Sequence, residues 1–192
     1  MAMPMPTLLL PVLLLVLLLA GAAAQQQNRV EPLAGCGRDE QPVAKAGVQT
    51  VRCDAGTPQF PERRIGYTLA VPEHCARAGG GCGVIMDVHG FTMSAEEQEI
   101  CDDMRVRGNA AGFIVLQPSA PVNPNSSLGI PSPDWWPRYH HPQLIAFLRH
   151  TVALFGADRR RVHISGYSQG GFASWNILCL APDLSEWPQT TL

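Results

Sequence analysis

The stretch Gly166-Tyr167-Ser168-Gln169-Gly170-Gly171 decides the fold, because it joins a short apolar run to an apolar segment of helical character. The run before it is Val162 to Ser165, and the segment after it is Phe172 to Leu180. This order predicts a strand, a sharp turn and a helix, with Ser168 at the apex of the turn. Glycines two residues before and after Ser168 let the backbone pass close to the strand and the helix without a side-chain clash. The pattern is typical of a nucleophile elbow.

Short apolar strands alternate with helices upstream of this turn. A capping box formed by Ser94 and Glu97 predicts a helix from Ala95 to about Gly108 or Ala111. A second helix is expected from Pro142 to Phe155. The expected strands cover residues 48–52, 64–71, 84–88, 113–117 and 161–165. Consecutive βαβ units of this kind predict an α/β fold, with a mainly parallel sheet and helices on both of its faces.

Sites in such folds form where the strands end, at their carboxyl edge. Two strand ends in this sequence carry turns suited to chemistry, His89-Gly90-Phe91 and the turn at Ser168 itself. The segment Ala120 to Pro137 is a long loop rich in proline, asparagine and serine, and it contains Trp135 and Trp136. Loops of this length inside a domain are usually functional. Either substrate contact or simple anchoring of the loop explains the two tryptophans.

The amino-terminal end of the 192-residue chain predicts secretion. Residues Leu8 to Ala20 are apolar, too short for a membrane span, and lead to small residues at a plausible cleavage site, Ala22-x-Ala24. We therefore expect a signal peptide at 1–24 and no stable membrane insertion after its removal, with an uncleaved anchor as the alternative. Residues 25–60 are expected to form an irregular section with disulfides, and 61–192 the α/β domain.

The six cysteines predict a disulfide framework if the chain is secreted, because oxidising compartments favour paired cysteines. Proximity favours Cys75 with Cys82 and Cys36 with Cys53. Cys101 and Cys179 remain, both in expected helices, and either a bridge or two buried free thiols fits them.

Charge and composition limit the partners. The formal net charge is -2 and the basic residues are scattered apart from Arg159-Arg160-Arg161, so we expect no nucleic-acid binding. No cysteine and histidine spacing indicates a metal site, and we expect no cofactor. Asn125-Ser126-Ser127 is a glycosylation sequon.

The order of these elements resembles the α/β-hydrolase superfamily. Within it, the chain is similar to the secreted esterases grouped with polyhydroxybutyrate depolymerases and feruloyl esterases. The likeness runs from about Tyr67 to Leu180, and its most specific parts are VIMDVHG at 84–90 and DRRRVHISGYSQGG at 158–171. The resemblance implies hydrolysis of carboxylic esters, either of a polyester or of an aromatic or acetyl ester on a polysaccharide, so a polymeric substrate is within its scope.

The resemblance also implies roles for individual residues. Ser168 matches the nucleophile, and the backbone N–H of Gln169 matches one donor to the oxyanion. The second donor is expected to be the N–H of Phe91 or of Thr92. Contacts with substrate are expected from Trp135, Trp136 and Tyr167.

The sequence departs from this pattern after Ser168. An α/β-hydrolase triad continues with an acid and then a histidine, each following a later strand. No histidine follows Ser168, and Asp183 and Glu186 stand at the end of the elbow's own helix. We therefore expect a truncated hydrolase whose last strands are missing, which leaves the strand before the elbow as an unpaired edge.

Upstream histidines offer few substitutes for the missing base. His140 and His141 adjoin the tryptophan loop, but an adjacent pair at a helix start is expected to be exposed. His89 is expected to support the oxyanion turn or to be an ordinary strand-end residue. Two functions follow, a serine esterase acting through Ser168 and a non-catalytic binding protein that keeps the cleft. The sequence leaves the oligomeric state open.

Overall fold

A five-stranded mixed sheet forms the centre of the molecule, in the strand order β1-β2-β4-β3-β7. The computed structural model describes residues 30–54, 64–77 and 81–186, and the helices and strands lie in the unit Pro32–Leu192. The expected signal peptide and the expected boundary near residue 60 lie outside the described residues. The strands are β1 Gly47–Asp54, β2 Arg64–Val71, β3 Gly83–Val88, β4 Phe113–Ser119, β5 Val122–Asn123, β6 Ser132–Pro133 and β7 Val162–Gly166.

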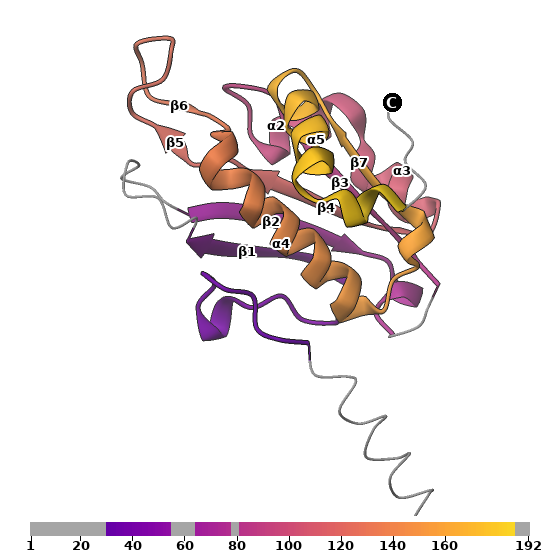
Figure 1. Cartoon of the computed structure of the whole chain (residues 1–192). Helices are drawn as coiled ribbons and strands as arrows, with labels where there is room; N and C mark the ends of the chain where they lie inside the picture. The colour runs from indigo at the N-terminus through magenta and orange to yellow at the C-terminus, as the bar shows by residue number, and fades with distance from the viewer. Residues whose placement is uncertain (1–29, 55–63, 78–80, 187–192) are drawn as a thin grey trace, which may run out of the picture. The chain divides into compact units, whose positions relative to one another are not determined.

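Helices cover both faces of this sheet. The helices are α2 Ala95–Asp102, α3 Met104–Ala110, α4 Pro137–Phe155 and α5 Gln169–Leu180, with 3-10 turns at Arg38–Glu40, Glu73–Cys75, Arg159–Arg161 and Pro182–Glu186. Figure 1 shows α4 and α5 together in front of the sheet, with α2 and α3 behind it. In the core, the ring of Tyr67 stacks on Phe147 of α4 with their centroids 3.7 Å apart.

The pairing of the strands differs from the expectation of a mainly parallel sheet. β3 pairs in parallel with β4 and with β7, whereas β2 is antiparallel to both β1 and β4. Antiparallel neighbours need no crossover helix, so β1 and β2 lie outside the βαβ pattern from which a parallel sheet was expected. The parallel half of the sheet is the half that carries the elbow.

The expected strands are confirmed, but the helix expected from Ala95 to Gly108 or Ala111 is two helices. Ser94 caps α2 with the predicted capping box. The chain then breaks at Asp103, which has a left-handed φ of 56°. Side chains take over the N–H groups that start α3, since Asp102 accepts from Met104 and Glu99 accepts from Arg105. Two successive aspartates favour such a break because their short side chains compete for backbone donors.

The helix expected from Pro142 begins five residues earlier, at Pro137. Both prolines suit a first helical turn, and the sequence pattern alone selects neither. The imidazole Nδ1 of His140 accepts the N–H of Trp136 at 3.0 Å, which fixes the start of α4 next to the tryptophan loop. The loop itself contains the two-stranded β5 and β6 hairpin.

Two disulfides join the predicted pairs, Cys36 with Cys53 and Cys75 with Cys82. Cys101 and Cys179 are free and exposed, so the expectation of a bridge or of buried thiols is wrong for both. Each lies on the outward side of its helix, and their position in helices alone did not indicate which side they face. Among the described residues, no helix has both the length and the apolar character needed to cross a membrane.

A buried polar cluster lies between β3, β4, β7 and α2. Asp87 is 2% exposed, and it accepts hydrogen bonds from Ser165 at 3.0 Å and from Gln117 at 3.1 Å. Burial, opposed by the bond from Gln117 and reinforced by the nearby Asp102 carboxylate, raises the pKa of Asp87 to about 6. The carboxyl group therefore keeps its proton at pH values where an unfolded aspartate has lost it.

We predict that the Asp87→Asn variant loses one component of the pH dependence of folding. Between about pH 4 and 6 the folded protein holds a proton that the unfolded chain has released, so the contribution of Asp87 to stability falls as the pH rises. Urea midpoints at pH 5 and pH 7 should show the wild type gaining more stability on acidification than the variant. Asp39→Asn, at an exposed position, serves as the control, and equal gains in Asp87→Asn and wild type would contradict the prediction.

Candidate active site

Ser168 stands at the junction of β7 and α5 in a strained conformation. Its backbone has φ 51° and ψ -114°, a conformation that residues other than glycine rarely adopt. Its neighbour Tyr167 donates its N–H to the carbonyl of Val88 at 3.1 Å, which ties the turn to the end of β3. Ser168 is exposed. The predicted strand, sharp turn and helix are thus confirmed, with the serine at the apex.

The glycines beside Ser168 are required by close backbone contacts. A Cβ atom added to Gly170 would lie 1.9 Å from the carbonyl oxygen of Val88, and one added to Gly166 would lie 2.5 Å from Gly170. Both distances are far below van der Waals contact. The first turn of α5 therefore packs directly on the backbone of β3 and β7, as the sequence predicted.

Among the described residues, two of the three N–H groups expected to act as oxyanion donors have no backbone acceptor. The N–H groups of Gln169 and Phe91 donate to no backbone acceptor within the described residues. Thr92, the alternative donor, has a positive φ of 69° and already donates its N–H to the carbonyl of Pro133 at 3.1 Å. The His89-Gly90-Phe91 turn and the elbow are neighbours, because a Cβ on Gly90 would lie 2.9 Å from the Tyr167 ring.

His89 holds the turn that follows β3. It is fully buried, and its Nε2 accepts the N–H of Ala120 at 2.9 Å. Its Nδ1 therefore carries the proton and donates to the carbonyl of Gly90 at 2.7 Å. Burial lowers the pKa of His89, against the opposing effect of that bond. Because both nitrogens are used, His89 supports the turn and has no free nitrogen with which to accept a proton from Ser168.

The tryptophan loop is fastened to the elbow by the side chain of Gln169. Its Oε1 accepts the N–H of Trp135 at 3.0 Å, and its Nε2 donates to Asp134 at 2.7 Å. The indole N–H of Trp135 reaches the carbonyl of His89 at 3.0 Å. Trp135 is 2% exposed, so it anchors the loop rather than offering its face to a ligand. Trp136 is half-buried and Tyr167 is exposed.

Asp134 is a site residue that the sequence reasoning did not single out. Its carboxylate accepts from Gln169, from the side-chain amide of Asn123 at 2.9 Å, and from the Trp136 indole at 3.0 Å. It thereby joins two parts of the tryptophan loop, at Asn123 and at Trp136, to the elbow. No local pattern could have revealed the link to the elbow, since Gln169 lies 35 residues further along the chain.

His140 and His141 correct an expectation, because both are buried instead of exposed. They are 0% and 2% exposed, and burial lowers the pKa of each to about 4, helped at His140 by the neighbouring His141. α4 starts five residues earlier than expected, which places the pair inside the helix and on its packed side. The chain's six histidines all lie in described parts, and none of the hydrogen bonds found among the described residues joins one of them to Ser168.

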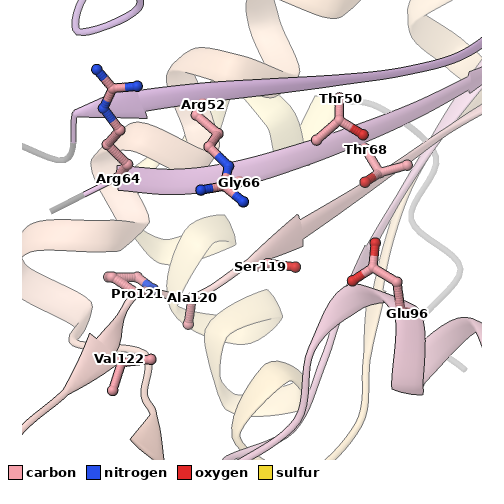
Figure 2. A pocket seen from close by; sticks show the side chains of 10 residues that line it. All are labelled: Thr50, Arg52, Arg64, Gly66, Thr68, Glu96, Ser119, Ala120, Pro121 and Val122. Atoms are coloured by element: carbon pink, nitrogen blue, oxygen red, sulfur yellow. The ribbon is translucent and has the colours of Figure 1, made fainter. Parts of the chain in front are cut away.

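A polar pocket lies beside β1 and β2, next to the end of β4 (Figure 2). It has a volume of about 200 Å³ and is open where Gly66 of β2 leaves space between Arg52 and Ser119, its register partners on either side. The pocket is lined by Thr50, Arg52, Arg64, Gly66, Thr68, Glu96, Ser119, Ala120, Pro121 and Val122. Ala120 connects the pocket to His89, and none of the predicted site residues lines it.

Three solved structures to which the chain is similar are esterases. The chain is similar to an acetyl xylan esterase from Aspergillus awamori, with 20% identity, a TM-score of 0.55 and coverage of 72% of this chain and 49% of that one. It is also similar to the carboxylesterase EstE1, cloned from a metagenomic library, with 17% identity, a TM-score of 0.50 and coverage of 78% of this chain and 47% of that one. A bacterial heroin esterase has 18% identity, a TM-score of 0.50 and coverage of 76% of this chain and 44% of that one. The chain thus spans about half the length of these proteins.

These likenesses show that the chain has the α/β-hydrolase fold, as the sequence resemblance implied. At such identities they show the fold alone. Neither the models of known protein families nor the curated proteins give a match.

The close contact between Gly170 and Val88 predicts that a side chain at position 170 destabilises the fold. Gly170→Ala should lower the free energy of unfolding by about 3 kcal/mol, because the added methyl group overlaps the carbonyl and forces the elbow away from β3. Thermal unfolding followed by circular dichroism measures the loss. Gly171→Ala is the control, since its Cβ would lie 3.2 Å from the nearest atom. Equal midpoints for the two variants would show that the elbow is not packed this closely.

Proposed function

We propose that this chain is a serine ester hydrolase that acts through an acyl group carried on Ser168. The observation that carries the proposal is the exposed serine at a strained turn, beside two N–H groups, of Gln169 and Phe91, that donate to no backbone acceptor among the described residues. The esterases that share the fold support the same chemistry. In this reaction the Ser168 oxygen attacks the ester carbonyl carbon, and the hydroxyl proton passes to a base while the alcohol leaves. Water then attacks the acyl group and frees the serine.

The negative oxygen formed during attack needs donors that are already in place. We assign this role to the N–H of Gln169 and the N–H of Phe91. Phe91 is preferred over Thr92 because the N–H of Thr92 is already bonded to Pro133. Gln169 has a second role through its side chain, which holds the tryptophan loop against the elbow.

This proposal assigns no residue as the base. His89 uses both nitrogens within the fold, and among the described residues none of the other histidines is hydrogen-bonded to Ser168. General base catalysis contributes about 10² to 10⁴ in rate, so we expect the chain by itself to be acylated slowly and to release the acyl group more slowly still. The same observation favours a second candidate, a non-catalytic protein that binds esters in the cleft.

The substrate we favour is an acetyl or feruloyl ester of a polysaccharide, ahead of a polyhydroxyalkanoate-like polyester. The pocket in Figure 2 offers the guanidinium of Arg52 and the hydroxyls of Thr50, Thr68 and Ser119, which suit the hydroxyl groups of a sugar. Near the elbow, the aromatic side chains of Trp136 and Tyr167 are half-buried and exposed respectively. The repeating units of a polyester carry only acceptor oxygens, whereas the hydroxyl groups of a sugar both donate and accept hydrogen bonds.

We also propose that the protein is secreted after removal of residues 1–24. Two disulfides support an oxidising compartment. Asn125 is exposed in the loop after β5, where a glycan at the sequon meets no packed surface.

Exposure of the protein to p-nitrophenyl acetate should acetylate Ser168 with little turnover. The activated ester needs no help in releasing its alcohol, so acylation proceeds without an efficient base, whereas attack by water on the acyl group does not. Peptide mass spectrometry should find the acetyl group on the peptide that contains Ser168, and the release of p-nitrophenol should stop near one equivalent.

The Ser168→Ala variant is the control for this experiment. It should lose the modification and the release of p-nitrophenol together. Acetylation that persists at the same rate in Ser168→Ala would rule out Ser168 as the acceptor. Rapid turnover that depends on Ser168 would refute the expected lack of a base while leaving the esterase proposal intact.

Arg52→Ala should weaken the binding of acetylated xylo-oligosaccharides by about tenfold, the usual effect of losing a hydrogen bond from a charged group. Isothermal titration calorimetry measures this affinity. Arg38→Ala, at an exposed position outside the pocket, is the matched control. The acetylation of Ser168 by p-nitrophenyl acetate should not change, because that ester has no sugar. An unchanged affinity in Arg52→Ala would remove the pocket from the substrate site.

A further inference from the structure

The pocket beside β1 and β2 contains a guanidinium group that no other described residue neutralises. None of the ion pairs found among the described residues includes Arg52, which lies beside the space left by Gly66, its register partner on β2. Arg64 also lines the pocket but pairs with Glu40 at 2.8 Å. Figure 2 shows the side chain of Arg52 directed toward Gly66 and that of Arg64 pointing the other way. Arg52 is therefore the positive charge that the pocket offers to a ligand.

A carboxylate matches this charge better than a phosphate does. A guanidinium binds the two oxygens of a carboxylate through two parallel N–H bonds, and the two charges cancel. A phosphate monoester carries a charge of about -1.5 to -2, of which one guanidinium balances only part. The remainder would be repelled by the carboxylate of Glu96, which lines the same pocket. The charges thus favour a ligand with a single carboxylate near Arg52.

The other side chains of the pocket suit a sugar. The hydroxyl groups of Thr50, Thr68 and Ser119 line it, and Glu96 adds an acceptor for hydroxyl groups of a ligand. The oxygen of Ser119 accepts the N–H of Ala95 at 3.0 Å, and its proton donates to no acceptor within the described residues. The volume of about 200 Å³ is below the roughly 300 to 1,000 Å³ of pockets that enclose drug-sized ligands. A single sugar unit is of a suitable size.

The pocket lies at the same edge of the sheet as Ser168. β2 is antiparallel to β4, so Gly66 near the start of β2 pairs with Ser119 at the carboxyl end of β4. β3 is parallel to β4 and to β7, which places the end of β7 and the elbow at that edge too. Glu96 follows Phe91 by five residues, which span at most about 18 Å. A sugar chain of a few units is long enough to join the pocket to the proposed oxyanion donors.

We propose that this pocket binds the carboxylate of a uronic acid unit, and that the ester acted on at Ser168 is carried by a neighbouring unit of the same acidic polysaccharide. Arg52 holds the carboxylate, while Glu96 and the three hydroxyl groups contact the hydroxyl groups of the sugar ring. This assignment rests on the proposed esterase function, because it makes the pocket part of the substrate site. It narrows the substrate from polysaccharide esters in general to esters of acidic polysaccharides.

A matched pair of oligosaccharides tests the assignment. Xylotetraose with a glucuronic acid branch carries the carboxylate, and reduction of that group to an alcohol gives a neutral oligosaccharide with a glucose branch. In isothermal titration calorimetry the wild type should bind the acidic form about fivefold more tightly, the upper range for an exposed ion pair. Arg52→Gln should bind both forms equally. Arg64→Gln is the matched control and should keep the preference, because Arg64 is paired with Glu40.

The Glu96→Gln variant should change the preference in the opposite direction. It removes a negative charge from the pocket and keeps an acceptor oxygen, so the preference for the acidic form should exceed that of the wild type. Circular dichroism verifies that each variant is folded. Equal affinities of the wild type for the two oligosaccharides, or a preference that survives Arg52→Gln, would overturn the uronic acid assignment.

The acetylation of Ser168 by p-nitrophenyl acetate separates this assignment from the esterase proposal. Acetylation of Ser168 together with equal affinities for the two oligosaccharides would refute the uronic acid assignment alone. A preference that depends on Arg52 without any acetylation of Ser168 would refute the esterase proposal and keep the pocket as a binding site for acidic sugars.

Discussion

The structure depends on how closely the first turn of α5 approaches the end of β3. At Gly170 the two backbones leave no room for even a methyl group, and the N–H of Tyr167 is bonded to Val88 at the same point. This contact sets the angle between strand and helix, and so forces Ser168 into a conformation that it would not adopt alone. The packing of the parallel strands and α5 supplies the free energy that maintains this strain. The exposure of the serine is a result of that packing.

A second set of interactions brings a distant loop to the same place. Gln169 holds Trp135 and Asp134 with its side chain, while Trp135 reaches back to His89. The elbow, the turn after β3 and the tryptophan loop are consequently a single hydrogen-bonded unit. Gln169, whose backbone N–H we propose as an oxyanion donor, thus also holds the tryptophan loop through its side chain, and the two roles are separable by substitution.

The elements nearest the elbow were the ones that could be predicted from the sequence. Glycines at fixed offsets from Ser168, the capping box at Ser94 and the short apolar strands are local patterns with local causes. The hairpin of β1 and β2, the break at Asp103 and the burial of His140 were missed, because each depends on contacts beyond the pattern of its own segment. The same holds for Asp134, whose partner Gln169 lies 35 residues further along the chain.

The protonation of His89 has a consequence for the response of the site to acid. Its two bonds require a proton on Nδ1 and a bare Nε2, which faces the N–H of Ala120. A proton added to Nε2 would point directly at that N–H and break the bond between the turn after β3 and the loop after β4. His89 therefore holds the turn after β3 and the loop after β4 together only while its ring is neutral. Acid strong enough to protonate this ring would therefore loosen the contact between the turn after β3 and the loop after β4.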